Sequence, residues 1–384
     1  MKVLIGAENF GFGPVSKLRT IIDMSMLSKC DLYFIGTIEI YNFLRRNLEL
    51  EIKMIDNFQL ANKISFDYIV SVMEPSLILY GKYSNIPTCF VDSLFEFWNW
   101  EKDDIRQIEN LKKSMDQEYE FDNWLSRYSK LSNHQQELLA YLFADEIFVQ
   151  TAWQVKNRDF LNNKIKKVRP IVDTRFVAEE SYERNSIIIS LSGMNNPLIS
   201  KEDNLQYIKF ISKVINRTPL LKDALVTVSP QYLDEAKKII ENKVVSLTHT
   251  EFLKKLSHSH FVLAPMGLTT FFEALEYKTI FVPLPEYHHG HIWNWRKINK
   301  ELGNLPKVLI SEHCDILGGD INETLTALYK IYRSRDAEYD YYISKSANEI
   351  SNYMEKENNN FFNVEMNSSI NEYINDFVGN NNVQ

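Results

Sequence analysis

The chain has 384 residues, which is more than one hydrophobic core usually holds, so we expect two domains. A hydrophobic fraction of 45% indicates a globular protein. The formal net charge of −8 excludes binding to nucleic acid or to an anionic membrane through a broad basic surface.

Cysteine spacing and the apolar runs indicate a cytoplasmic protein. Cys30, Cys89 and Cys314 lie far apart with no CxxC pair, which is typical of a reducing compartment. No stretch approaches 18 apolar residues without charge, so no transmembrane segment is expected. The short apolar run at the N-terminus lacks the features of a signal peptide and is interpreted as a first strand.

Strand-forming and helical segments alternate through the first half of the chain. The first strand, at 2–7, leads through a loop with Gly11 and Gly13 to a helix that begins at Pro14. Further strands are expected at 32–35, 68–72, 88–91, 146–150 and 167–172. The alternation predicts a parallel sheet in a domain that spans residues 1–172.

A charged, aromatic and helical region at 95–142 interrupts this alternation. It is longer than a simple crossover requires. Pattern alone favours an outer helical layer with solvated charges over an insertion on the substrate side.

A second alternation follows a polar segment at 173–185, which is interpreted as the linker between domains. Strands are expected at 186–191, 224–228, 244–247, 261–264 and 280–283, with helices at 205–214, 233–240, 251–257 and 269–277. The second domain therefore spans residues 186–334, and residues 335–384 are expected to form C-terminal helices with a frayed tail from Asn375. Two such arrays predict two Rossmann-like halves facing a central cleft.

The segment from the strand at 261–264 to the helix at 269–277 has the features of a diphosphate seat. Gly267 allows a ligand to approach the backbone, the helix N-terminus offers unpaired N–H groups, and Thr269 and Thr270 add hydroxyls. Glu273, one turn later, is placed to accept hydrogen bonds from ribose hydroxyls. The alternative is structural, because Thr270 and Glu273 also match a capping box.

The runs Gly267-Leu-Thr-Thr-Phe-Phe-Glu273, Phe281-Val-Pro-Leu-Pro285 and His288-His-Gly-His-Ile-Trp-Asn294 resemble the donor-binding signature of GT-B glycosyltransferases. The peptidoglycan N-acetylglucosaminyltransferase and the UDP-glycosyltransferases are similar in this region. The resemblance implies an α/β GT-B fold and a UDP-linked sugar donor, which is a co-substrate, so no cofactor is implied. The implied donor-binding residues are Gly267, Leu268, Thr269, Thr270, Glu273, His288, His289 and Asn294.

A loop at the start of the second half adds to this resemblance. Ser192, Gly193 and Met194 follow the strand at 186–191, where the family places a loop near the phosphates. The run 168–172 resembles the strand that closes the first domain of the family.

Several absences indicate the type of reaction. No Asp-x-Asp occurs, which argues against a metal-bridged donor. Retaining GT-B enzymes carry a second glutamate eight positions before the ribose acid, where this chain has Pro265. We therefore expect an inverting, metal-independent hexosyltransferase whose helix end stabilises the departing diphosphate.

The N-terminal loop departs from the family, which often places a histidine base where this chain has Pro14. Glu8 and Asp92, at strand ends, are the two candidates for the base. Gly11, Gly13 and Lys17 are candidates for a phosphate or acceptor loop. For Lys17 and Arg19 the alternative is a solvated helix face.

Other functions remain open. An epimerase on the same fold needs several acids and histidines around the sugar in the first domain, and the sequence shows no such cluster. A hydrolase normally needs a histidine base to activate water, and that base is missing here. A catalytically silent sugar-nucleotide binding protein would keep the segment 267–273 and lose turnover. His288, His289 and His291 are spaced tightly without a partner acid, so no metal site is expected. The sequence gives neither the acceptor nor the oligomeric state.

Overall fold

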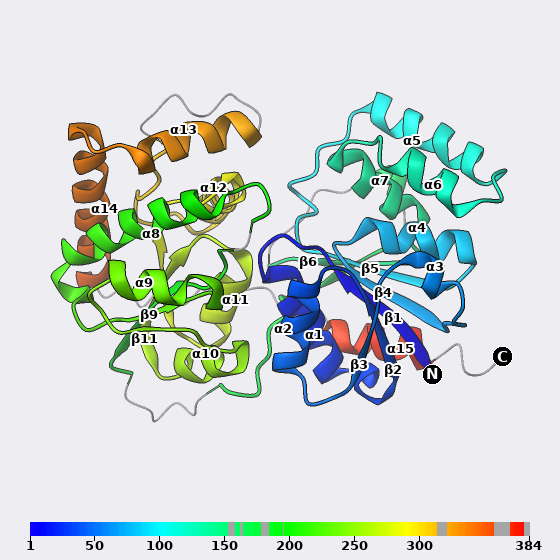
Figure 1. Ribbon diagram of the computed structural model, residues 1–384, viewed down its shortest axis with the longest axis horizontal. Coiled ribbons are helices and arrows are strands. Elements are labelled where there is room, and N and C mark those ends of the chain that lie inside the picture. The colour runs from blue at the N-terminus through cyan, green and yellow to red at the C-terminus, as the bar shows by residue number, and fades with distance from the viewer. Residues whose placement is uncertain are drawn as a thin grey trace. The chain divides into compact units, whose positions relative to one another are not determined.

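The computed structural model describes residues 1–152, 158–161, 164–177, 184–194, 196–312, 321–356 and 369–379. Its chain divides into two compact units (Figure 1). Unit 1 comprises Met1–Ile171 with Val364–Gln384, and unit 2 comprises Val172–Asn363. In the described part of the chain, no helix combines the length and apolar character needed to cross a membrane.

Unit 1 contains a parallel sheet of seven strands in the order β3-β2-β1-β4-β5-β6-β7. The strands are β1 (Lys2–Ala7), β2 (Asp31–Ile35), β3 (Ile52–Ile55), β4 (Tyr68–Val72), β5 (Thr88–Asp92), β6 (Glu146–Gln150) and β7 (Ile165–Val168). Strand β3 was not expected, because its four residues include an exposed lysine and form an edge of the sheet. The expected strand at 167–172 is shifted toward the N-terminus.

Alternating residues of the strands in unit 1 enter two separate cores. Leu4 belongs to one core and Val3 and Ile5 to the other, since successive side chains of a strand point to opposite faces. The helices are α1 (Gly13–Met24), α2 (Ile38–Asn47), α3 (Phe58–Ala61), α4 (Pro75–Ser84), α5 (Lys102–Met115), α6 (Phe121–Tyr128), α7 (Asn133–Phe143) and α15 (Ile370–Gly379). The expected helical layer at 95–142 thus forms α5 to α7, and its tryptophans Trp98, Trp100 and Trp124 pack in a core.

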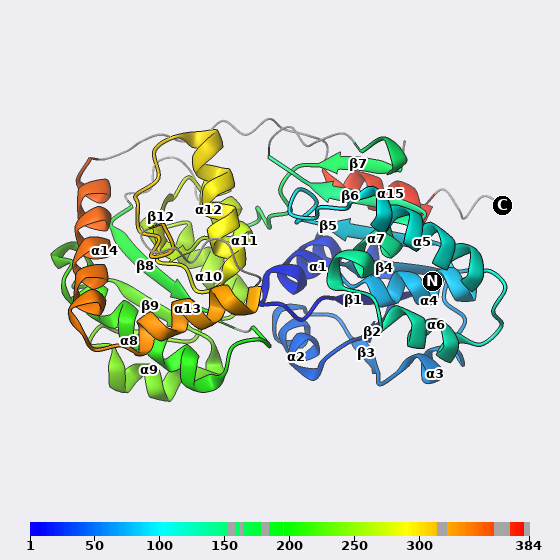
Figure 2. The same cartoon turned by 90° about the horizontal axis from the view of Figure 1, so that it is seen from above.

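The C-terminal helix α15 corrects the expectation of a frayed tail. The helix lies beside β6 and β7 (Figure 2). Ile370, Ile374 and Val378 are buried in the same core as β1 and α1, and Tyr373 stacks on Phe148 of β6. Because these apolar residues are four positions apart, they lie on one face of the helix, and that face packs on the core. Residues 370–379 therefore belong to unit 1, and the prediction of fraying from position 375 is wrong as far as 379.

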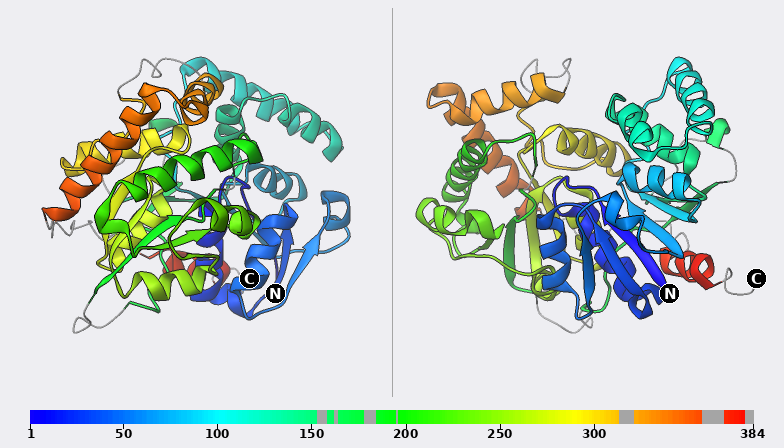
Figure 3. Two further views of the ribbon diagram at one scale, coloured as in Figure 1. Left: turned by 60° about the vertical axis from the view of Figure 1, so that its left-hand side comes forward. Right: turned by 45° about the vertical axis from the view of Figure 1, so that its right-hand side comes forward.

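Unit 2 contains a parallel sheet of five strands in the order β10-β9-β8-β11-β12. The strands are β8 (Ser186–Leu191), β9 (Leu225–Val228), β10 (Val244–Val245), β11 (Ser259–Pro265) and β12 (Ile280–Leu284). The helices are α8 (Lys201–Asn216), α9 (Leu233–Ile239), α10 (His249–Leu256), α11 (Leu268–Glu276), α12 (His289–Leu302), α13 (Ile321–Arg333) and α14 (Ala337–Glu355). Helices α8, α13 and α14 pack together (Figure 3).

In each sheet the chain first forms an inner strand and then adds strands toward one edge. It then returns and adds the remaining strands on the other side of the first strand. This order is that of Rossmann-like domains, so the predicted α/β class with two Rossmann-like halves is confirmed. In such sheets ligands bind beyond the carboxyl ends of the strands. The strand ends of each unit are therefore the places to look for chemistry.

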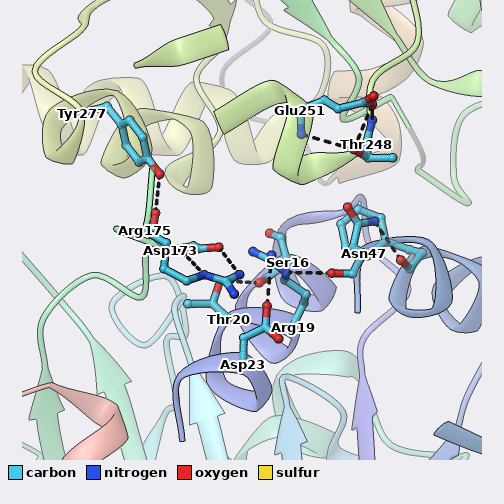
Figure 4. A network of polar contacts seen from close by, with 11 residues as sticks. Ser16, Arg19, Thr20, Asp23, Asn47, Asp173, Arg175, Thr248, Glu251 and Tyr277 are labelled. Atoms are coloured by element: carbon cyan, nitrogen blue, oxygen red, sulfur yellow. Dashed lines mark hydrogen bonds and ion pairs between the residues drawn. The ribbon is translucent and has the colours of Figure 1, made fainter. Parts of the chain in front are cut away.

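The start of the expected linker is anchored in unit 2. Asp173 is fully buried and forms a bidentate ion pair with Arg175, with distances of 2.9 and 2.7 Å (Figure 4). The Tyr277 hydroxyl donates to the carbonyl oxygen of Asp173 at 2.6 Å. Residues 178–183 lie outside the described part of the chain.

Candidate donor site and carboxylate cluster

The turn between β11 and α11 leaves the helix N-terminus open to a ligand. Gly267 is the N-cap residue, and no side chain in the described part of the chain caps the helix. In general, the N–H groups of the first turn of a helix have no acceptor within their own helix. Because Thr270 lies within the helix, it is not an N-cap, and the capping-box interpretation is wrong.

Nothing in the backbone or the packing requires glycine at position 267. Its φ of −86° is accessible to any residue. A Cβ there would lie 3.8 Å from the carbonyl oxygen of Pro265 and 4.0 Å from Nε2 of His291, which are ordinary contacts. Close approach of a ligand to the backbone is another reason for glycine at a position that neither strain nor packing explains.

Glu273 is buried on the first turns of α11 and is held by a histidine. It is 3% exposed, and its Oε1 lies 2.7 Å from Nε2 of His249, the first residue of α10. Glu273 thus has a fixed orientation and a second oxygen left to accept a ribose hydroxyl. His249 was not predicted as a partner of Glu273, because it lies 24 positions earlier in the chain.

Tyrosine hydroxyls fix the loop that joins β12 to α12. Three consecutive carbonyl oxygens of this loop, at 285, 286 and 287, each accept a hydrogen bond from the phenol of a buried tyrosine. The donors are Tyr207 to Pro285 at 2.8 Å, Tyr332 to Glu286, and Tyr329 to Tyr287 at 3.2 Å. The carboxylate of Glu286 in turn accepts the amides of Ile310 and Ser311. The loop therefore presents the following histidines rigidly.

The histidines at the start of α12 are neutral hydrogen-bonding groups. The Nδ1 atom of His291 accepts from the amide of Tyr287 at 3.2 Å, so its proton resides on Nε2, the atom that faces Gly267. Burial, and then the neighbouring His288, lower the pKa of His291 well below its usual value. Burial likewise lowers the pKa of His288 to about 3 and also lowers that of His289.

The remaining candidates of unit 2 lie on elements next to this turn. The Nδ2 atom of Asn294 donates to the carbonyl oxygen of Met266 at 2.9 Å and so braces the turn before α11. Ser192 donates to Thr227 of β9 at 3.0 Å. A Cβ at Gly193 would meet no atom within 4 Å, while Met194 is buried. Since β8 pairs with β11, the loop at 192–194 and the turn at 267 follow adjacent strand ends.

Unit 1 has acidic residues at three adjacent strand ends. Glu8 follows β1, and its amide donates to Val72 at the end of β4. Glu74 follows β4 after Met73, whose φ of 57° is left-handed and costs roughly 1 kcal/mol. Asp92 ends β5.

Asp92 has no freedom to act as a base. It is fully buried, its Oδ1 accepts the amide of Leu94 at 2.6 Å, and its Oδ2 accepts both Nε1 of Trp98 at 3.0 Å and the hydroxyl of Tyr141. Burial raises the pKa of Asp92, whereas these donors lower it. The arrangement favours Glu8 over Asp92 as the base.

Glu137 of α7 joins these acids. Burial, and then Asp92, Glu8 and Glu74, raise its pKa well above the usual value. Burial, Glu74 and Asp92 raise the pKa of Glu8 to about 8. We call Glu8, Glu74, Asp92 and Glu137 the carboxylate cluster. This cluster contains acids but no histidine, so it is not the mixed group of acids and histidines that an epimerase was expected to need. Glu137 was missed because a glutamate in an amphipathic helix usually faces water.

The N-terminal loop differs from the expected phosphate loop. Gly11 has a φ of 72°, so its backbone conformation already accounts for glycine there. The Nζ of Lys17 lies 3.5 Å from the carbonyl oxygen of Gly13. Arg19 pairs with Asp23 at 3.0 Å (Figure 4). Lys17 and Arg19 are 3% and 1% exposed, so the interpretation of a solvated helix face is wrong.

Among the described residues, no group of three or more His, Cys, Asp or Glu side chains is arranged to hold a metal ion. This statement includes His288, His289 and His291. The donor groups of the seat in unit 2 are backbone amides and neutral imidazoles.

No protein-family model matches the sequence, and no curated protein does. Solved structures are similar to it. The S. aureus MnaA–UDP co-structure is 13% identical with a TM-score of 0.50, and the match covers 96% of this chain and 100% of that one. Spinosyn rhamnosyltransferase SpnG complexed with thymidine diphosphate is 10% identical with a TM-score of 0.50, covering 92% and 96%. At such identities the likeness shows the fold, and the chain has the GT-B fold that its donor-binding signature implied.

Proposed function

We propose that the chain is an inverting, metal-independent glycosyltransferase that moves a sugar from a UDP-linked donor to a small-molecule or glycan acceptor. The observation that carries the proposal is the uncapped N-terminus of α11, with Gly267 open beside it and Glu273 held one turn away. The two similar structures, MnaA with UDP and SpnG with thymidine diphosphate, support a nucleoside diphosphate as the ligand.

In this proposal the amides of residues 268–270 and Nε2–H of His291 donate to the diphosphate. Charge builds on the leaving diphosphate as its bond to the sugar breaks, and donors fixed in advance stabilise that charge without reorganising. Glu273 accepts a ribose hydroxyl, and His249 keeps its carboxylate in place.

Glu8 takes the proton of the acceptor nucleophile. Its pKa of about 8 is closer to neutrality than that of an ordinary glutamate, which makes it a stronger base when ionised. The rate of transfer should therefore rise with pH up to about 8. Glu8→Gln should abolish that rise.

Calorimetric titration with UDP tests the seat. Gly267→Ala introduces a methyl group that fits the folded protein, so its stability should change by less than about 1 kcal/mol. The methyl occupies the space of the diphosphate, so the affinity for UDP should fall at least tenfold. Glu273→Gln should also weaken UDP binding, whereas Glu276→Gln, on the exposed side of the same helix, should not. If the Gly267→Ala protein bound UDP with the affinity of the wild type, the diphosphate would not lie at this position.

The carboxylate cluster favours one second candidate, an epimerase or hydrolase on the same fold. These reactions move protons at the sugar and use several acids. Incubation with radiolabelled UDP-sugars separates the candidates, because a transferase labels the acceptor, an epimerase yields an isomeric nucleotide sugar, and a hydrolase yields free sugar without acceptor.

A further inference from the structure

We propose that the carboxylate cluster of unit 1 binds an ammonium group, so that the acceptor is a compound bearing a primary amine. The inference names the acceptor class of the proposed transferase and rests on that proposal for the reaction, although the binding itself does not depend on it. It follows from three features of the cluster: an unpaired acid, an access side and a deficit of positive charge.

The unpaired acid is Glu137. It is 3% exposed, and its Oε2 is buried without a hydrogen-bond partner in the described part of the chain. A desolvated carboxylate with no partner is costly, and native proteins rarely keep one unless it serves a ligand. Asp92, Glu8 and Glu74 raise the pKa of Glu137, so its carboxyl group faces the cluster.

The access side is formed by Glu8 and Tyr128. Both are partly exposed, whereas Asp92 and Glu137 are buried. Burial, and then Glu74, Glu137 and Glu8, raise the pKa of Tyr128, so its phenol lies close to these acids and stays protonated. A tyrosine ring beside carboxylates is a favourable environment for a cation.

Among the described residues, the cation found to act on the cluster is Arg158, and it acts on Asp92. The guanidinium is already engaged, because it donates to the carbonyl oxygens of Phe95 and Trp98 and lies 4.2 Å from the ring centre of Trp100. It therefore does not satisfy Glu137. The remaining titratable groups around the cluster, Tyr128, His134 and Tyr141, are neutral near pH 7.

An ammonium group fits this arrangement better than a metal ion. The carboxylates come from four separate segments, and no group of three described residues is arranged to ligate a metal. An ammonium has three N–H donors, which reach acceptors spread around it. A neutral hydroxyl would leave the carboxylate charge uncompensated.

Calorimetry on the full chain tests the inference with cyclohexylammonium and methylammonium against cyclohexanol and methanol, from pH 6 to 9. The amines should bind at least tenfold more tightly than the alcohols. Alkylammonium groups stay charged in this range, as lysine does. Their affinity should therefore rise by up to about tenfold per pH unit toward pH 8, as the cluster loses the proton of Glu8. Equal binding of amine and alcohol, no binding of either amine, or an affinity independent of pH would overturn it.

Variants separate this role from a structural one. Glu137→Gln and Glu8→Gln should each weaken amine binding at least tenfold, while the exposed Glu109→Gln should not. Above pH 8 the Glu137→Gln protein should melt at or above the wild-type temperature, because a buried charge has been removed; a lower melting temperature with unchanged amine binding would overturn the assignment. Titration of the same samples with UDP distinguishes this inference from the proposed transferase. Normal UDP binding without a preference for amines would contradict the amine acceptor but not the nucleotide-binding seat.

Discussion

Stability of unit 1 should depend on pH through Glu8. Burial, Glu74 and Asp92 raise the pKa of Glu8 from 4.5 to about 8, so the folded state holds this proton more tightly than the unfolded state. The stabilisation is complete below pH 4.5 and is lost as the pH rises to about 8. Each pH unit between the two pKa values is worth about 1.4 kcal/mol, which sets an upper limit of about 5 kcal/mol. Because Glu8 is partly exposed, water reduces this to roughly 2–3 kcal/mol.

Glu8→Gln removes this dependence without changing the shape of the side chain. Relative to the wild type, the variant should be equally stable at pH 4.5 and more stable by roughly 2–3 kcal/mol at pH 9. Urea unfolding followed by the fluorescence of Trp98 and Trp100, which lie in unit 1, measures the difference at each pH. Glu109→Gln, an exposed change in the same unit, provides the control. Parallel curves for Glu8→Gln and wild type from pH 5 to 9 would refute the reasoning, because the raised pKa would then not exist.

Two substitutions test the framework around the sites. Tyr207→Phe leaves the carbonyl oxygen of Pro285 without its donor. It should lower the free energy of unfolding in urea by about 1–3 kcal/mol and weaken UDP binding severalfold. Loss of stability without any effect on UDP binding would show that the loop does not position the seat. Ile374→Ala should destabilise unit 1 by about 2–5 kcal/mol, because Ile374 is fully buried in its core, and a change below 1 kcal/mol would show that α15 does not pack there.

Most strands, and the strand–turn–helix structure around Gly267, were predictable because their signals are local. The apolar run of β11, the glycine turn and the helix at 268–276 are contiguous, so one segment specifies the seat. The short edge strand β3 has no such signal: its four residues are buried, exposed, half-buried and buried in turn, which is also compatible with a loop.

Long-range partners were not predictable. His249 and Glu273 pair across two elements, and Glu137 meets Glu8 only because α7 packs on the sheet that β1 begins. A single sequence contains the residues but not the packing that brings them together. The interpretation of Lys17 and Arg19 as a solvated face failed for the same reason, since the pattern of one helix does not reveal what covers it.

A diphosphate seat in this chain has to work with neutral groups. Residues 265–276 and 285–295 contain no lysine or arginine, and the nearest cation in this part of the sequence, Arg296, acts on His289. Burial keeps the pKa of His291 low, so the donors that face Gly267 are amide and imidazole dipoles. The Debye length falls from about 10 Å at 0.1 M salt to about 3 Å at 1 M, and interactions at direct contact are screened least. UDP affinity measured by calorimetry should therefore fall less than about threefold over this range. A steep decrease would mean that a lysine or arginine from elsewhere holds the diphosphate, and the neutral seat at Gly267 would have to be abandoned.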